Sequence, residues 1–203
     1  QVARAQMTKD VLLKQELEIA RELQNKLYPP PPESLGAVHI AAKAVPALET
    51  SGDLYDFIHL DQSRIGIVVA DVTGKSMAAA LMMAMARSVF RAEARQSLSA
   101  GEVLTNVNTI LCADTSIKQM ITAWYGILDT HTLTLRYANA GHPFALLRRQ
   151  GAVMELEAFG LPLRALADLA YAEETITLQP GDCVLLHTDG VAEMMNARRE
   201  LFS

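Results

Sequence analysis

Cysteine is scarce in this sequence, and its two cysteines lie far apart. Cys112 and Cys183 belong to no CxxC pair, so neither a disulfide framework nor a paired-thiol metal site is expected. We predict that both are reduced residues of the core, as is usual in a reducing cytoplasm. The expected location is therefore cytoplasmic.

Long hydrophobic runs and clusters of positive charge are also missing. The alanine- and methionine-rich segment near residue 80 is interrupted by Arg87 and Arg91, so no transmembrane span is expected. The formal net charge is -5, and the chain has neither a basic run nor a signal peptide. Nucleic acid and membrane surfaces are therefore not expected as partners.

The composition that remains is that of a globular protein. Half of the 203 residues are hydrophobic and a fifth are charged. This length predicts one domain with a sizeable core and room for an appendage. Because the chain begins with Gln1 and not with methionine, we expect it to be a fragment of a longer protein.

The N-terminal segment, Thr8–Leu27, is predicted to be a helix. Its heptad seam consists of Leu13, Leu17, Ala20, Gln24 and Leu27. Pro29–Pro32 then ends the helix. Two interpretations stay open: the helix packs on its own domain, or residues 8–27 form a parallel coiled-coil homodimer that continues an upstream sensor. Residues 1–32 are thus a predicted linker helix, and residues 33–203 the folded domain.

The rest of the chain combines predicted strands with two helices. A strand at Val38–Val45 precedes a hairpin, and helices follow at Met77–Arg95 and after the capping box of Ser99 and Glu102. A β-meander and two later strands are expected at Met120–Leu128, Leu133–Ala138, Phe144–Arg148, Val153–Glu157, Ala172–Leu178 and Cys183–Thr188. Strands linked by hairpins, with a helix pair between them, predict an α+β fold with antiparallel sheets.

The hairpin carries the first candidate site. If Leu54–Leu60 and Arg64–Ala70 pair around Gln62 without a bulge, Asp53 faces Asp71. Facing residues of an antiparallel pair have Cβ atoms about 4.5–5.5 Å apart, and like charges at that distance repel. A divalent cation between them is the economical explanation, and carboxylate oxygens favour magnesium or manganese.

A third carboxylate, Asp189, also lies at the end of a predicted strand. Like Asp53 and Asp71, it has a glycine nearby, whose backbone can approach a ligand closely. Together the three aspartates are predicted metal ligands. Two cations about 3.5–4 Å apart would support hydrolysis of a phosphoryl group without a protein nucleophile.

Three other polar residues, His142, His187 and Lys75, belong to the segments near the predicted site. His142, in a predicted turn, is expected to make a structural hydrogen bond. His187 points to the same face as Asp189 and is expected to pack beside the site. Lys75 is expected to be a surface residue, although it follows the Asp71 loop and could contact a phosphate.

Five motifs, taken as a set, resemble those of a known family. They are SGDLYDF at Ser51–Phe57, VVADVTGKSMAAAL at Val68–Leu81, NAGHPF at Asn139–Phe144, GLPL at Gly160–Leu163 and LQPGDCVLLHTDGVAE at Leu178–Glu193. Their order and spacing resemble bacterial PPM-type (PP2C-type) serine/threonine phosphatases of the SpoIIE/RsbU group. Glu16–Pro30 is similar to the helix that precedes the catalytic domain in that group.

The resemblance implies a PP2C-like four-layer αββα sandwich, in which two antiparallel sheets are flanked by helix pairs. It implies two manganese or magnesium ions, one served by Asp53, Asp71 and the backbone carbonyl of Val72, the other by Asp71 and Asp189. The implied activity is hydrolysis of phosphoserine or phosphothreonine. The typical substrate is an anti-sigma-factor antagonist of the STAS type, in partner-switching control of transcription.

The chain departs from the family pattern at three places. Ser51 and Ser76 stand where the family usually has glycine, which requires that φ be negative at both. The group's last metal-binding aspartate follows a segment like Glu200–Phe202, and this chain ends at Ser203. The domain is therefore expected to be truncated at its C-terminus, with one metal site incomplete.

Two functions other than a phosphatase are also compatible with parts of the sequence. A phosphoaspartate enzyme would use Asp71–Gly74, which resembles the Asp-Lys-Thr-Gly of phosphorylated ATPases, but its parallel sheet conflicts with the hairpin. A pseudophosphatase would bind a phosphoprotein partner without turnover. The three retained aspartates argue against this second alternative, whereas a missing C-terminal ligand leaves it open.

Overall fold

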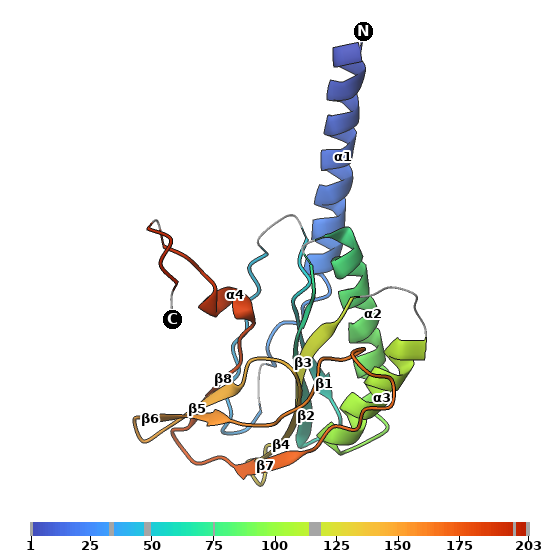
Figure 1. The fold of residues 1–203 in the computed structure, drawn as a ribbon. Helices are drawn as coiled ribbons and strands as arrows, with labels where there is room; N and C mark the ends of the chain where they lie inside the picture. The colour runs from blue at the N-terminus through green and yellow to red at the C-terminus, as the bar shows by residue number, and fades with distance from the viewer. Residues whose placement is uncertain are drawn as a thin grey trace.

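The computed structural model describes residues 2–32, 35–46, 50–74, 76–113, 119–196 and 198–201. A long helix projects from a body of two sheets and a helix pair (Figure 1). In chain order the elements are α1 (Val2–Asn25), β1 (Leu54–His59), β2 (Arg64–Val72), α2 (Met77–Glu93), α3 (Ala100–Ala113), β3 (Ile121–Asp129), β4 (Thr134–Ala140), β5 (Ala145–Arg149), β6 (Ala152–Leu156), β7 (Glu174–Thr177), β8 (Cys183–Leu185) and α4 (Asp189–Ala192).

The strands form two antiparallel sheets. A five-stranded sheet has the order β1-β2-β3-β4-β7, and a three-stranded sheet has the order β6-β5-β8. Helices α2 and α3 lie against one face of the larger sheet (Figure 1). The predicted α+β class with two antiparallel sheets is confirmed, and the described residues form three layers of the expected sandwich: helix pair, large sheet and small sheet.

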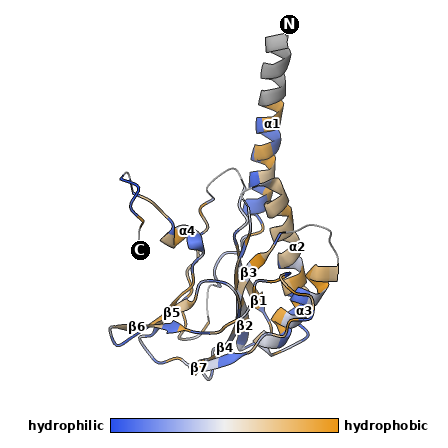
Figure 2. Ribbon diagram, in the orientation of Figure 1, coloured by the Kyte–Doolittle hydropathy of each residue, from blue (hydrophilic) through white to orange (hydrophobic). Residues whose placement is uncertain are grey.

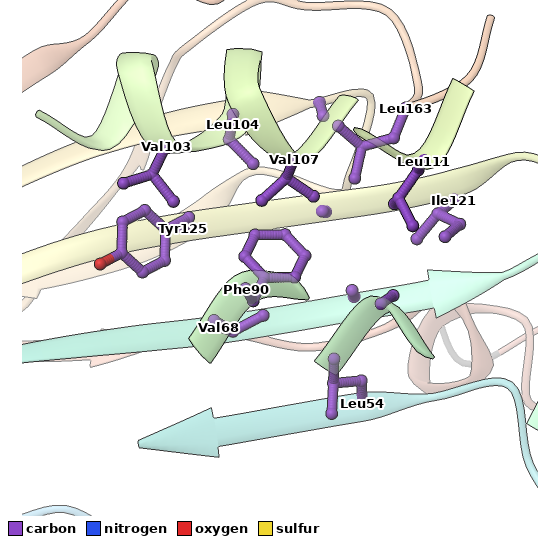
Figure 3. Packing of buried hydrophobic residues seen from close by; sticks show 14 of the residues in the cluster. Leu54, Val68, Phe90, Val103, Leu104, Val107, Leu111, Ile121, Tyr125 and Leu163 are labelled. Carbon is purple, nitrogen blue, oxygen red and sulfur yellow. The ribbon is translucent and has the colours of Figure 1, made fainter. Parts of the chain in front are cut away.

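The main core lies between the helix pair and the five-stranded sheet. Its α2 side is made largely of small and flexible side chains, among them Ala79, Met83 and Ala86, all buried. Such residues let a helix approach a sheet closely and fill irregular gaps. Phe90 of α2 meets Tyr125 of β3 with ring centroids 6.1 Å apart, below a row of apolar α3 residues (Figure 3).

A second core lies between the two sheets. Trp124 stacks on Tyr137 with ring centroids 5.9 Å apart, and Phe57 and Ile65 join them. Side chains alternate between the two faces of a strand, so odd-numbered residues of β1 and β2 face this core while even-numbered ones face the helices. The side chains of Asp53 and Asp71 therefore lie on the inter-sheet side.

The predicted strand at Val38–Val45 is wrong. Within residues 35–46, pairing is limited to an isolated bridge between Leu35 and Val38. The apolar side chains of Ile40 and Ala42 pack against the inter-sheet core instead. The alternation of apolar residues reflected burial of one side of the segment, not membership in a sheet.

The predicted continuous β-meander is also wrong, because the chain changes sheets after β4. At the predicted turn, Asn139 holds His142 by two hydrogen bonds: its Nδ2 donates to the His142 carbonyl (2.9 Å), and its Oδ1 accepts from the His142 N–H (2.7 Å). Gly141 adopts a φ of 69°. Strands β4 and β5 consequently pair with β7 and β8, not with each other.

The C-terminal end of α1 packs on its own domain, as the first of the two interpretations predicts. Gln24 is buried, and Leu27 and Tyr28 pack against the main core. Further back, Leu12 and Ile19 are exposed, and polar and apolar residues alternate along the projecting helix (Figure 2). A dimer through residues 8–27 stays a prediction, and the same holds for the division at residues 32 and 33.

The structure bears on the predictions for the two cysteines and for a membrane span. Both cysteines are free, but Cys112 is only half-buried and Cys183 is exposed, so their assignment to the core is wrong. Within the described ranges, no helix combines the length and the apolar character that crossing a membrane requires.

Candidate metal site

The β1–β2 hairpin has the register that the sequence predicts. Leu54 pairs with Ala70, and the pairing continues to His59 with Ile65. Beyond the strand, the Val72 N–H donates to the Gly52 carbonyl at 3.3 Å, which keeps the same register. Asp53 and Asp71 lie between these two contacts and therefore face each other on the inter-sheet side of the hairpin.

The carboxylate of Asp53 is held from its own loop. The Ser51 hydroxyl donates to Asp53 Oδ2 and accepts from the Asp53 N–H, both at 3.0 Å. Ser51, which departs from the family pattern, thus fixes the side chain beside it. Its φ is acceptable, because positive φ among the described non-glycine residues occurs only at Leu133, Gln150, Arg164 and Arg199.

Oxygen atoms of Asp71 and Val72 border the space next to Gly52. A Cβ atom added at Gly52 would lie 2.5 Å from the Val72 carbonyl oxygen and 3.2 Å from Asp71 Oδ1. Any side chain there would therefore collide with the backbone. The glycine leaves open the space beside one carboxylate oxygen and one carbonyl oxygen, which are donor types that magnesium and manganese prefer.

The loop after Asp71 is tied to the start of β3. The Thr73 N–H donates to the Met120 carbonyl at 3.0 Å, and the Met120 N–H donates to Thr73 Oγ1 at 3.2 Å. Gly74 has a φ of 104°, and Ser76, the residue before α2, has a φ of -142°. Serine is therefore acceptable at position 76, as the sequence required. Lys75 lies outside the described residues.

Asp189 follows the last strand of the small sheet. It is the first residue of α4, follows β8 by four residues and is exposed. Among the described residues, no group of three or more His, Cys, Asp or Glu side chains converges on one point. The hairpin register places Asp53 opposite Asp71, while the roles of Asp53, Asp71 and Asp189 as metal ligands stay predictions.

His142 connects the two sheets below the site. It is 4% exposed, and its Nδ1 lies 2.9 Å from the hydroxyl of Thr122, the β3 residue that pairs with Asp71. This is the structural hydrogen bond that the sequence predicted. The half-buried His187, two residues before Asp189, lies near enough to His142 to affect its pKa.

The burial of His142 predicts a loss of stability in acid. Burial lowers the pKa of His142 to about 4, although the backbone of His187 acts in the opposite direction. Between pH 6.5 and 4 the unfolded chain binds a proton here that the folded chain does not. The free energy of unfolding should therefore fall by about 3 kcal/mol from this group as the pH is lowered through that interval.

Urea unfolding of the unmodified protein and of a His142→Asn variant, at several pH values, measures this contribution. Between pH 6.5 and 4, the free energy of unfolding of the variant should fall by about 3 kcal/mol less than that of the unmodified protein. His131→Asn, in the exposed turn after β3, is the matched control. Parallel profiles for the unmodified protein and His142→Asn would contradict the expectation.

Sequence reasoning missed a buried ion cluster behind the site. Asp56 of β1 is fully buried, and Arg91 of α2 donates to both of its oxygens, from Nε at 2.6 Å and from Nη2 at 2.7 Å. Arg87 Nε lies 3.2 Å from the same carboxylate. The two arginines are four residues apart on one helix face, a spacing that could have indicated a shared anionic partner. The cluster docks α2, which follows the Asp71 loop, onto β1.

Comparison with known proteins identifies the family. The family model for Stage II sporulation protein E (SpoIIE) matches residues 61–203. The chain belongs to the SpoIIE family. This SpoIIE domain is 34% identical over 185 residues to the phosphoserine phosphatase RsbU of Bacillus subtilis (strain 168), covering 89% of this chain and 54% of RsbU. It therefore spans about half the length of that relative.

Solved structures share the fold of the SpoIIE domain. The SiaA-PP2C domain of Pseudomonas aeruginosa is 21% identical and superposes with a TM-score of 0.80, over 96% of this chain and 79% of that domain. RsbX in complex with magnesium is 19% identical, with a TM-score of 0.58 over 70% of this chain and 67% of RsbX. The PP2C-like fold expected from the motifs is thus confirmed.

Proposed function

We propose that this SpoIIE domain is the catalytic domain of a metal-dependent protein phosphatase that hydrolyses phosphoserine or phosphothreonine. The observation that carries the proposal is the facing pair of Asp53 and Asp71, beside the carbonyl of Val72, in a chain of this family. The relative RsbU is a phosphoserine phosphatase, which supports the same reaction. The antiparallel pairing on both sides of β2 is at odds with the parallel sheet of a phosphoaspartate enzyme.

The donor set fits a hard divalent cation. Asp53 and Asp71 supply negative oxygens that would otherwise repel each other, and Val72 supplies a neutral one. Asp71 and Asp189 would serve a second manganese or magnesium ion. Bound there, such ions lower the pKa of water toward neutrality and offset charge on a phosphoryl group. RsbX, a structural neighbour, was solved with magnesium, which supports this choice of metal.

Residues of this chain hold the two facing aspartates in position. The Ser51 hydroxyl holds one oxygen of Asp53, so the carboxylate is oriented in advance. Asp71 pairs with Thr122 of β3, and its neighbour Ala70 pairs with Leu54 of β1, so the backbone of Asp71 is held within the sheet. Such preorganisation lets electrostatic stabilisation act without rearrangement during the reaction.

The finer assignments belong to the same proposal. We propose a phosphorylated STAS-type anti-sigma-factor antagonist as the substrate and an upstream sensor on the same polypeptide as the regulator. The likeness to RsbU and the family motifs support the first of these. The projecting α1, which reaches from the body of the domain toward the N-terminus, supports the second (Figure 1).

Removal of metal tests the proposed activity. Phosphate release from a phosphoserine peptide should require added manganese in the full-length protein, disappear after treatment with a chelator and return when manganese is restored. A rate that is unchanged by the chelator would contradict a metal-dependent phosphatase. Binding of the phosphopeptide without release, in the presence of manganese, would favour the pseudophosphatase instead.

A further inference from the structure

The segment Ser51–Asp53 leads into β1 at the edge of the five-stranded sheet and bends at Gly52. Gly52 uses its carbonyl to bond Val72 of β2. The backbone groups of Ser51 and Asp53, on either side of Gly52, bond side chains on the side away from β2. No strand of the described sheet lies on that side, since β1 is its edge strand. Unpaired backbone groups at such an edge would leave the segment loosely held.

The C-terminal end of α1 takes the place of the missing strand at Ser51. Gln24 is 5% exposed, and both the nitrogen and the oxygen of its side-chain amide bond the backbone of Ser51. Its Nε2 donates to the Ser51 carbonyl at 2.7 Å, and its Oε1 accepts from the Ser51 N–H at 2.9 Å. This is the donor and acceptor pair that a neighbouring strand would supply.

Tyr28 completes the arrangement at Asp53. Its hydroxyl donates to the Asp53 carbonyl at 2.7 Å, and its ring stacks on Tyr55 with centroids 5.0 Å apart. The Asp53 N–H is taken by the Ser51 hydroxyl. The N–H and C=O groups of Ser51 and Asp53 thus all have partners. Three of the four are side-chain atoms of Gln24 and Tyr28, and the fourth is the Ser51 hydroxyl.

We propose that Gln24 and Tyr28 are positioning residues for Asp53, which hold its backbone at the sheet edge so that its carboxylate faces Asp71 across the site of the divalent cation. The inference rests on the proposed metal-dependent function and adds the residues that keep one half of the site in place. Groups that orient a metal ligand typically change metal affinity by about 10–100-fold when they are removed.

Manganese affinity of the metal-stripped full-length protein tests this role. Free manganese can be counted by electron paramagnetic resonance, without any measurement of turnover. Tyr28→Phe removes one hydroxyl and keeps the stacked ring, while Gln24→Leu removes both bonds to Ser51 and keeps a good helix former. Each should weaken binding by about tenfold. Gln15→Leu, the same change at an exposed position of α1, should leave the affinity unchanged.

The outcomes separate positioning from mere support of the fold. Weaker manganese binding by Tyr28→Phe, at an unaltered urea midpoint, supports the proposal. If Asp53→Asn loses manganese binding but Tyr28→Phe and Gln24→Leu bind manganese as tightly as the unmodified protein, the proposal is overturned. This holds even if the urea midpoint of either variant falls. If Asp53→Asn binds manganese as tightly as the unmodified protein, the metal site itself fails. Tyr28→Phe decides alone if Gln24→Leu does not fold.

Discussion

Replacing Asp71 by asparagine is expected to lower manganese-dependent phosphate release by at least about 100-fold. Removing a residue that only orients a metal ligand already lowers metal affinity or activity by about 10–100-fold. Removing a ligand that is shared between two ions should lower activity by at least as much. Asparagine keeps the shape of the side chain but removes its charge and one of its two oxygen acceptors. The measurement is release of phosphate from a phosphoserine peptide, or turnover of para-nitrophenyl phosphate, by the full-length protein.

The same hairpin offers a matched control for Asp71→Asn. Asp61 lies in the turn at the opposite end, where it pairs with Arg64 in an exposed position. Asp61→Asn makes the same chemical change far from the site and should leave turnover close to that of the unmodified protein. Equal rates for Asp71→Asn and the unmodified protein would remove the basis for the proposed phosphatase.

Replacing Asp56 by asparagine is expected to lower the free energy of unfolding by about 3–5 kcal/mol. The carboxylate is fully buried, and its loss leaves Arg91 and the largely buried Arg87 without their shared counter-charge. Breaking one partner of a buried ion cluster costs far more than the intact cluster contributes, because the remaining charge stays desolvated. Urea unfolding, followed by circular dichroism at neutral pH, measures the change.

Asp61→Asn again serves as the comparison for stability. It also breaks an aspartate–arginine pair of the β1–β2 hairpin, but both partners of that pair are partly exposed. Water replaces the lost partner at such a position, so its effect on the unfolding midpoint should be much smaller. Similar midpoints for the two variants would show that burial of Asp56 does not carry the stability assigned to it.

The parts of the fold that sequence predicted best depend on near neighbours in the chain. The hairpin register followed from the symmetry of two strands about Gln62, and six pairs of the structure obey it. The facing of Asp53 and Asp71 is a direct consequence of that register. Likewise, the helix at Met77–Glu93 was recognisable because its apolar residues cover most of its circumference in one continuous stretch.

The parts that sequence missed depend on contacts between distant segments. Asn139–His142 has the appearance of an ordinary turn, and only the later strands β7 and β8 decide that the chain crosses between sheets there. In the sequence Gln24 is the polar residue of a heptad seam, which leaves both packing on the domain and dimerisation open, and its partner Ser51 lies 27 residues away. A side-chain amide in a heptad is compatible with either use, so the pattern alone cannot choose.

Gly52 illustrates the same limit within the site. As part of a Ser-Gly-Asp run it indicated close approach of a ligand, which any glycine allows. The structure gives a narrower reason, because the Val72 carbonyl occupies the place that a Cβ atom would take. That contact comes from the strand pairing, so the residue type was predictable from its motif while its cause was not.

The crossover after β4 also limits how the domain can be divided. Along the chain, β5 and β6 of the small sheet come before β7, the last strand of the large sheet. Strand β8, which completes the small sheet, comes after β7. A break between β1 and β7 separates strands of the large sheet, and a break between β5 and β8 separates strands of the small one. Every position from β1 to β8 falls in at least one of these intervals. The two sheets are therefore interleaved along the chain, and neither can be transplanted, duplicated or exchanged as a module without the other.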